Sequence, residues 1–197
     1  MNKKCRIITQ EEFEKIVEVI RYGYEFEGRK TRPNPRLAVL CITQANTGLR
    51  LGDCLNLTLN SIKHEGGRYH LQIVEQKTKK PRNFIIEPSI FTFLQSYALE
   101  NGIGVNTRLF PLSERAVNKQ IKRVGEYLGI TDLGSHSFRK FFAMSIYNSN
   151  GFNIELVREI LQHSSILITQ HYIGVSPQLV EQALLKHCYI PPIKVSE

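Results

Sequence analysis

Six side chains with catalytic or anion-binding chemistry lie in four short stretches of the sequence. The stretches read "NTGLRLGD", "EQKTKK", "HSFR" and "LQHSSILITQHYIG", and the side chains are Arg50, Lys77, His136, Arg139, His163 and Tyr172. Arginine binds phosphate through paired hydrogen bonds, lysine and histidine transfer protons, and tyrosine can act as a nucleophile. Each stretch alone is more typical of a surface ion pair, a solvated turn or a core edge, so only the combination suggests a site.

Cleavage of a phosphodiester bond has three requirements that these side chains can meet. Arg50 and Arg139 offer positive charge to the non-bridging oxygens, and the two histidines can hydrogen-bond the phosphate or handle the nucleophile's proton. Lys77 can protonate the departing 5′-oxygen, and Tyr172 can attack and conserve the bond energy in a phosphotyrosine. The sequence shows no acidic cluster suited to Mg²⁺, so we expect no metal cofactor and no two-metal nuclease.

The spacing between His163 and Tyr172 predicts a break in the helix that carries them. The two residues are nine positions apart, and at about 100° per residue a straight helix would turn by about 900° between them. Their side chains would then lie on opposite faces and could not serve one site. Ser164 or Ser165 in "HSS" can cap a new helix, so we expect Tyr172 on a short helix of its own.

The elements that position these residues can be inferred from periodicity and capping patterns. The sequence predicts a single, mainly α-helical α+β domain with one small antiparallel sheet or hairpin. The hairpin is expected at about 68–87, on either side of "KTKKP". Helices are expected at about 9–20, 34–48, 51–59, 88–99, 113–129, 136–149, 154–163, 166–173 and 176–187.

Composition narrows the class of partner. The chain has 197 residues, 26 Lys and Arg against 18 Asp and Glu, and a formal net charge of +8. This excess of positive charge favours nucleic acid or an acidic membrane surface as the partner. No apolar run approaches the roughly 18 residues that span a bilayer, and "MNKKCRIITQ" lacks the apolar segment of a signal peptide. The four cysteines are scattered without zinc spacing, so a reduced, cytosolic protein is expected.

Two groups of basic residues are candidates for binding DNA. One group lies on a face of the predicted helix at 113–129 other than its apolar face, and the other follows Lys77 in the hairpin turn. Phosphate contacts of this kind supply most of the affinity of proteins for DNA. The candidates are Arg115, Lys119, Lys122 and Arg123 on the helix, and Lys79 and Lys80 in the turn.

Taken together, the four stretches resemble the catalytic domain of tyrosine recombinases, the phage-integrase family, over roughly residues 7–175. The family's motifs are a "TGLR" arginine with an acidic residue three positions later, a hairpin lysine, H-x-x-R, an "LGHSS" histidine and a tyrosine nine positions beyond it. Here they read as Arg50 with Asp53, Lys77, His136 with Arg139, His163 and Tyr172. The departures are Gln162 for the usual glycine, and Phe138 and Lys140 for the usual leucine and histidine.

The resemblance implies site-specific DNA recombination that needs neither ATP nor a metal. Tyr172 would form a 3′-phosphotyrosyl bond and release a 5′-hydroxyl, which attacks the partner duplex on the way to a Holliday junction. Asp53 would orient Arg50 without touching DNA. Two alternatives stay open from the residues: DNA relaxation by a type IB topoisomerase, which shares this chemistry and fold, and a DNA-binding module without catalysis.

The resemblance also implies an assembly. We expect a catalytic domain over 1–175 and a C-terminal helix and tail over 176–197, with the tail docked on a neighbouring protomer. The partners would be double-stranded DNA at a specific site and further copies of the chain, four in the synapse and one in free solution. Both a fragment of a larger integrase and a single-domain recombinase fit this length. The protein is expected in the cytoplasm, at the nucleoid.

Overall fold

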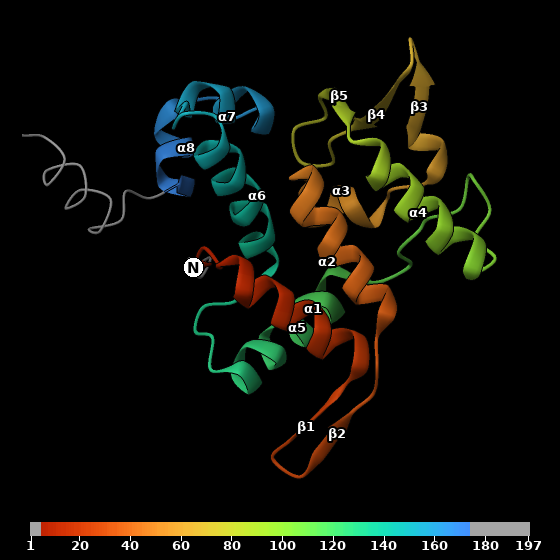
Figure 1. Cartoon of the computed structure of the whole chain (residues 1–197), viewed down its shortest axis with the longest axis vertical. Helices are drawn as coiled ribbons and strands as arrows, with labels where there is room; N and C mark the ends of the chain where they lie inside the picture. The colour runs from red at the N-terminus through yellow and green to blue at the C-terminus, as the bar shows by residue number, and fades with distance from the viewer. Residues whose placement is uncertain (1–4, 174–197) are drawn as a thin grey trace, which may run out of the picture.

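The structure, a computed structural model, describes residues 5–173 (Figure 1). Within this range the chain forms eight α-helices, one 3₁₀ helix and five short strands. The helices are α1 (Gln10–Tyr22), α2 (Pro35–Thr47), α3 (Leu51–Leu55), α4 (Pro88–Glu100), α5 (Glu114–Leu128), α6 (Ser135–Ser149), α7 (Ile154–Leu161) and α8 (Ile166–Ile173), with the 3₁₀ helix at Leu59–Ser61. The strands are β1 (Tyr24–Phe26), β2 (Arg29–Thr31), β3 (Ile62–Glu65), β4 (Arg68–Val74) and β5 (Pro81–Ile86).

The predicted fold class is confirmed, with corrections to individual elements. The hairpin expected at 68–87 is β4 paired with β5, and β3 extends it to an antiparallel sheet of order β3-β4-β5. The helix expected at 51–59 was too long, since α3 ends at Leu55. The hairpin of β1 and β2 was missed because strands of three residues are too short for an alternating pattern. The helix expected at 176–187 lies outside the described residues.

Helix α2 is the centre of the core. It packs against both α1 and α6, and most of its residues are buried, as expected for a helix that is apolar on nearly all sides. Asn34 caps its first turn by accepting from the Leu37 N–H at 3.0 Å, and Gly48 ends it. The rigid end of α2 therefore fixes the start of the "GLR" segment that follows it.

A second, smaller cluster of buried side chains joins α6, α7 and α8. Its fully buried members are Ala143, Val157, Leu161 and Ile173, and Tyr172 packs against them. Figure 1 shows these three helices (teal to blue) on one side of the molecule and the β3-β4-β5 sheet on the other. Between residues 5 and 173, no helix is long and apolar enough to cross a membrane.

Candidate active site

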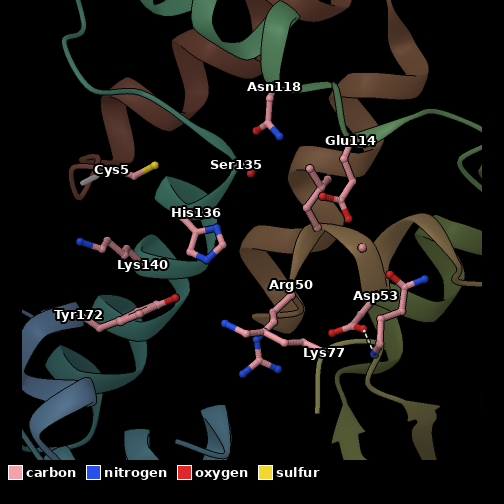
Figure 2. A pocket seen from close by; sticks show the side chains of 13 residues that line it. Cys5, Arg50, Asp53, Lys77, Glu114, Asn118, Ser135, His136, Lys140 and Tyr172 are labelled. Carbon is pink, nitrogen blue, oxygen red and sulfur yellow. Dashed lines mark hydrogen bonds between the residues drawn. The ribbon is translucent and has the colours of Figure 1, made fainter. Parts of the chain in front are cut away.

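A pocket of about 710 Å³ collects most of the predicted catalytic residues (Figure 2). It is lined by residues from α3, the turn between β4 and β5, the start of α5, the start of α6 and α8. Arg50, Asp53, Lys77, His136 and Tyr172 all line it, although they come from four separate parts of the chain. In Figure 2 the hydroxyl of Tyr172 points into the pocket, toward Arg50 and His136.

Gly48, in the "TGLR" turn, helps to position two arginines, Arg139 and Arg50. Gly48 has a φ of 62°, in the left-handed region that favours glycine. A Cβ atom at Gly48 would lie 2.4 Å from a ring carbon of Phe142, so the turn also has no room for a side chain. The carbonyl of Gly48 accepts a hydrogen bond from Arg139 Nη1, and Arg50 follows as the N-cap residue of α3.

Arg139 is fully buried beneath Tyr172 and does not line the pocket. Its side chain is 0% exposed, and its guanidinium carbon lies 6.0 Å from the centre of the Tyr172 ring. Its Nη2 donates to the carbonyl of Leu161 at 3.0 Å, which satisfies one of the free carbonyls at the end of α7. Arg139 thus links the end of α2 to the end of α7.

His163 is held as a neutral imidazole. Its side chain is 6% exposed, and burial, followed by the positive charge of Arg139, lowers its pKa to about 4. Its Nε2 lies 3.4 Å from Arg139 Nη2. Since arginine can only donate, Nε2 accepts, and the proton resides on Nδ1, which is 3.0 Å from Thr169 Oγ1. Both nitrogens of His163 therefore already have partners.

The predicted break between His163 and Tyr172 is confirmed. Helix α7 ends at Leu161, and Gln162 follows with a φ of 52°. This left-handed conformation explains why glycine is usual at the position, and the glutamine adopts it at a cost of about 1–2 kcal/mol. Ser165 Oγ accepts from the Leu167 N–H at 3.2 Å at the start of α8, as expected for one of the two serines proposed as caps.

Helix α8 presents Tyr172 to the site through its ring contacts. The centre of the Tyr172 ring lies 4.8 Å from that of His163 and 6.4 Å from that of His136. Lys140 Nζ lies 5.6 Å from the same ring centre, so the substitution of lysine for the family's histidine puts a cation beside the ring. The nucleophile is surrounded by cationic and imidazole groups.

Lys77 lies in the turn between β4 and β5, within the hairpin expected at 68–87. The Glu75 N–H donates to the Lys80 carbonyl at 3.0 Å, and the Lys79 N–H donates to the Glu75 carbonyl at 2.9 Å. These bonds close the turn, and Lys79 adopts a φ of 58° within it. Lys77 is exposed and lines the pocket, so its amine can reach a bound phosphodiester.

The carboxylate that contacts Arg50 is not the expected one. Glu75 Oε2 lies 2.6 Å from Arg50 Nη1. Asp53, which the resemblance pairs with Arg50, is buried and accepts from the Gln76 N–H at 2.8 Å. Asp53 was expected to orient Arg50. In the structure Glu75 forms the ion pair with Arg50, and Asp53 connects α3 to the turn that carries Lys77.

His136 stands in the first turn of α6, three residues before Arg139, as the H-x-x-R spacing predicted. Its ring is exposed and lines the pocket. Partial loss of solvent around the ring, and then the nearby positive charges, Arg139 first, lower the pKa of His136. The N-terminus of α6 adds a partial positive charge at the same place, so an anion is favoured there.

None of the predicted DNA-binding residues lines the pocket. Lys79 and Lys80 are exposed in the β4–β5 turn. On α5, Glu114 and Asn118 line the pocket itself, and the basic side chains lie on the other exposed sides of the same helix. Of these, Arg115, Lys119 and Lys122 are exposed and Arg123 is half-buried.

Reasoning from motifs missed two buried charged residues, Glu75 and Arg82. Glu75 continues the inward-facing positions of Leu71 and Ile73 on β4, and Arg82 shares the inward face of β5 with Phe84 and Ile86. The alternation of side chains along a strand would have placed both charges inside the molecule. A buried charge at such a position indicates a specific partner.

Comparison with known proteins identifies the family. The chain matches the phage integrase family over residues 6–178. It is 30% identical to the probable integrase/recombinase YoeC of Bacillus subtilis over 177 residues, which cover 86% of this chain and 91% of that protein. It is 28% identical to the tyrosine recombinase XerA of Pyrococcus furiosus over 186 residues, 90% of this chain and 60% of that one. The chain belongs to the phage integrase family.

Solved structures confirm the fold. The XerH site-specific recombinase bound to its difH substrate superposes with a TM-score of 0.65 at 25% identity, covering 93% of this chain and 55% of that one. The catalytic domain of bacteriophage HP1 integrase gives a TM-score of 0.61 at 22% identity, covering 92% and 95%. The fold is that of a tyrosine-recombinase catalytic domain, and these named relatives support recombination over topoisomerase activity. The chain spans about 60% of the length of XerA and 55% of that of XerH.

Proposed function

We propose that this chain cuts and rejoins double-stranded DNA at a specific site through a phosphotyrosine intermediate. The observation that carries the proposal is the convergence of Arg50, Lys77, His136 and Tyr172 on one pocket, with Arg139 and His163 packed directly under the tyrosine. Membership of the phage integrase family supports it. The proposal includes action in the cytoplasm on nucleoid DNA.

In the proposed reaction, the oxygen of Tyr172 attacks the scissile phosphorus and the bond to the 5′-oxygen breaks. Lys77 gives a proton to the departing oxygen, and Arg50 hydrogen-bonds the non-bridging oxygens on which charge develops. Arg139, buried beneath Tyr172, adds positive charge close to the reacting phosphate without lining the pocket. The product is a 3′-phosphotyrosyl bond with a free 5′-hydroxyl. A 5′-hydroxyl from the partner duplex then attacks the phosphotyrosine and releases Tyr172, so the cycle consumes no external energy.

The two histidines divide the remaining tasks. His136 lines the pocket beside Tyr172, and its lowered pKa keeps the imidazole neutral near neutral pH, so a ring nitrogen can accept the phenolic proton. Both nitrogens of His163 are already engaged, by Arg139 and Thr169. We assign to His163 the task of holding Arg139 in place. Between residues 5 and 173, no group of three or more His, Cys, Asp or Glu side chains is arranged to hold a metal ion.

Binding and assembly complete the proposal. The exposed basic residues of α5 and of the β4–β5 turn, two elements that also contribute residues to the pocket, contact the DNA backbone. Residues 1–175 form the catalytic domain, and residues 176–197 dock on a neighbouring protomer. Four protomers assemble in the synapse, and a cyclic exchange of tails lets each protomer respond to the state of the next.

The proposal is tested by trapping covalent complexes. The chain is incubated with fragmented DNA of its source cell, in EDTA and without ATP, and complexes that survive denaturation are sequenced. A shared target sequence is expected, and duplexes carrying it should recombine. Relaxation of supercoiled plasmid that lacks the target, at a rate equal to that of plasmid containing it, would instead indicate a topoisomerase. Absence of any covalent complex would reject the catalytic proposal.

A further inference from the structure

Glu75 lies at the centre of a buried group of charged side chains beside the pocket. It is 1% exposed at the end of β4. Its Oε2 lies 2.6 Å from Arg50 Nη1 and accepts from Thr78 Oγ1 at 2.7 Å. Its Oε1 lies 3.7 Å from Arg82 Nη1. One carboxylate thus contacts two arginines and the turn that carries Lys77.

The environment keeps Glu75 ionised. Burial alone would raise the pKa of Glu75, but hydrogen bonds from Thr78 and Arg50, and the charges of Arg50 and Arg82, lower it below its usual range. A buried carboxylate is tolerated only where such partners replace water. Glu75 therefore supplies a fixed negative charge among cations that would otherwise repel one another.

Arg82 anchors Glu75 to a distant part of the site. Arg82 is buried, and its guanidinium lies 4.4 Å from the centre of the Phe84 ring. Its Nη2 donates to the carbonyl of Ile160 at 2.9 Å, next to the Leu161 carbonyl that accepts from Arg139. The end of α7 is thus connected through Arg82 and Glu75 to Arg50.

We propose that Glu75 is the positioning residue for Arg50, and that it holds the guanidinium ready for the scissile phosphate. The inference rests on the function proposed above. Arg50 is 21% exposed in its side chain and would have several rotamers open to it without a partner. Glu75 engages one terminal nitrogen and leaves other donors for the phosphate oxygens. In the structure Arg50 forms its ion pair with Glu75, whereas Asp53 Oδ1 accepts from the Gln76 N–H.

The test compares Glu75→Gln with the wild type on three forms of the target duplex. The first form is unmodified, the second carries an uncharged methylphosphonate at the scissile position, and the third carries sulfur at the bridging 5′ position. Covalent adduct formation by the variant should fall by about 10- to 100-fold on the unmodified duplex, because small misplacements of a catalytic group are costly. Cleavage of the uncharged methylphosphonate needs less positive charge in the active site. On this duplex the variant should therefore form adduct at a rate within about threefold of the wild-type rate.

The sulfur substrate separates Arg50 from Lys77. A thiolate leaves without a proton, so this substrate relieves a defect in Lys77 and should not relieve Glu75→Gln. Recovery on the sulfur substrate alone, or an equal defect on all three forms, would overturn the inference. Glu65→Gln removes an exposed glutamate from β3 and should match the wild type on all three. If the wild type itself forms no adduct, the proposed function fails instead.

A second variant distinguishes a loss of Arg50 positioning from a loss of folding. Replacing Glu75 by glutamine leaves the buried Arg82 without its counter-charge, which can destabilise the fold. The double variant Glu75→Gln with Arg82→Met removes both charges and still deprives Arg50 of its charged partner. Provided that circular dichroism and thermal melting show it to be folded, it should show the same recovery on methylphosphonate. Loss of that recovery in the folded double variant would also overturn the inference.

Discussion

Acidification should destabilise the fold through His163, and the structure gives the size of the effect. The imidazole is 6% exposed, with Nε2 facing the Arg139 guanidinium and Nδ1 bonded to Thr169. A proton on Nε2 would place two cations 3.4 Å apart. The native state therefore resists a proton that the unfolded chain accepts.

The magnitude follows from the two pKa values. An ordinary histidine has a pKa of about 6.5, and that of His163 is lowered to about 4. Between these values the unfolded state binds more protons than the native state, so stability rises with pH there. At about 1.4 kcal/mol per pH unit, the full contribution of His163 is about 3 kcal/mol. It is present above pH 6.5 and is lost as the pH falls to about 4.

The assay is urea unfolding of the wild type and His163→Gln between pH 7.5 and pH 4, roughly the range in which histidine titrates. Glutamine keeps polar atoms at the site but does not titrate there. The wild type should lose about 3 kcal/mol more of its free energy of unfolding across this range than the variant does. His64→Gln replaces an exposed histidine on β3, so it should keep the wild-type dependence on pH. Parallel curves for the wild type and His163→Gln would refute the neutral, buried imidazole.

Three further predictions concern the lysine, the glycine turn and the tail. Lys77→Ala should cleave an ordinary duplex much more slowly than the wild type, and should recover much of its rate on a duplex with a 5′-sulfur leaving group. An equal defect on both duplexes would mean that Lys77 only binds phosphate, and Lys79 or Lys80 would become the candidate proton donor. Gly48→Ala should lower the free energy of unfolding in urea by about 2 kcal/mol or more, since alanine is strained at this φ and meets Phe142; an unchanged midpoint would reject that crowding. Deletion of residues 176–197 should leave a folded protein that cleaves single sites poorly, fails to recombine and loses higher-order DNA complexes in native gels; unfolding of the deletant would assign the tail to its own core.

Features of the structure that depend on residues close together in the sequence could be predicted from it. Helix α5 was expected at 113–129 from periodicity and capping patterns, and in the structure Ser113 and Gly129 are its cap residues. The break at "HSS" was expected from geometry alone, because His163 and Tyr172 cannot face one site from a single straight helix. Both conclusions depend on neighbours within a few residues, which a sequence displays directly.

The site's supporting contacts were not predictable in the same way. The hydrogen bond from Arg82 to the Ile160 carbonyl joins residues that are 78 positions apart, and nothing in either segment alone specifies the other. The same holds for Arg139 and the Gly48 carbonyl. The resemblance to the family implied that Asp53 orients Arg50, because the two residues are neighbours in one motif. The fold instead brings Glu75 to Arg50 from the end of β4.

The most direct test of the account is to identify the amino acid that carries the DNA. Adducts formed by the full chain on its target duplex are digested with nuclease and protease, and the peptides are analysed by mass spectrometry. We predict a nucleotide linked through its 3′-phosphate to the peptide that contains Tyr172. Tyr172→Phe should bind the duplex normally and give no adduct. A nucleotide on Tyr147 or another tyrosine, or an adduct that persists in Tyr172→Phe, would contradict the account.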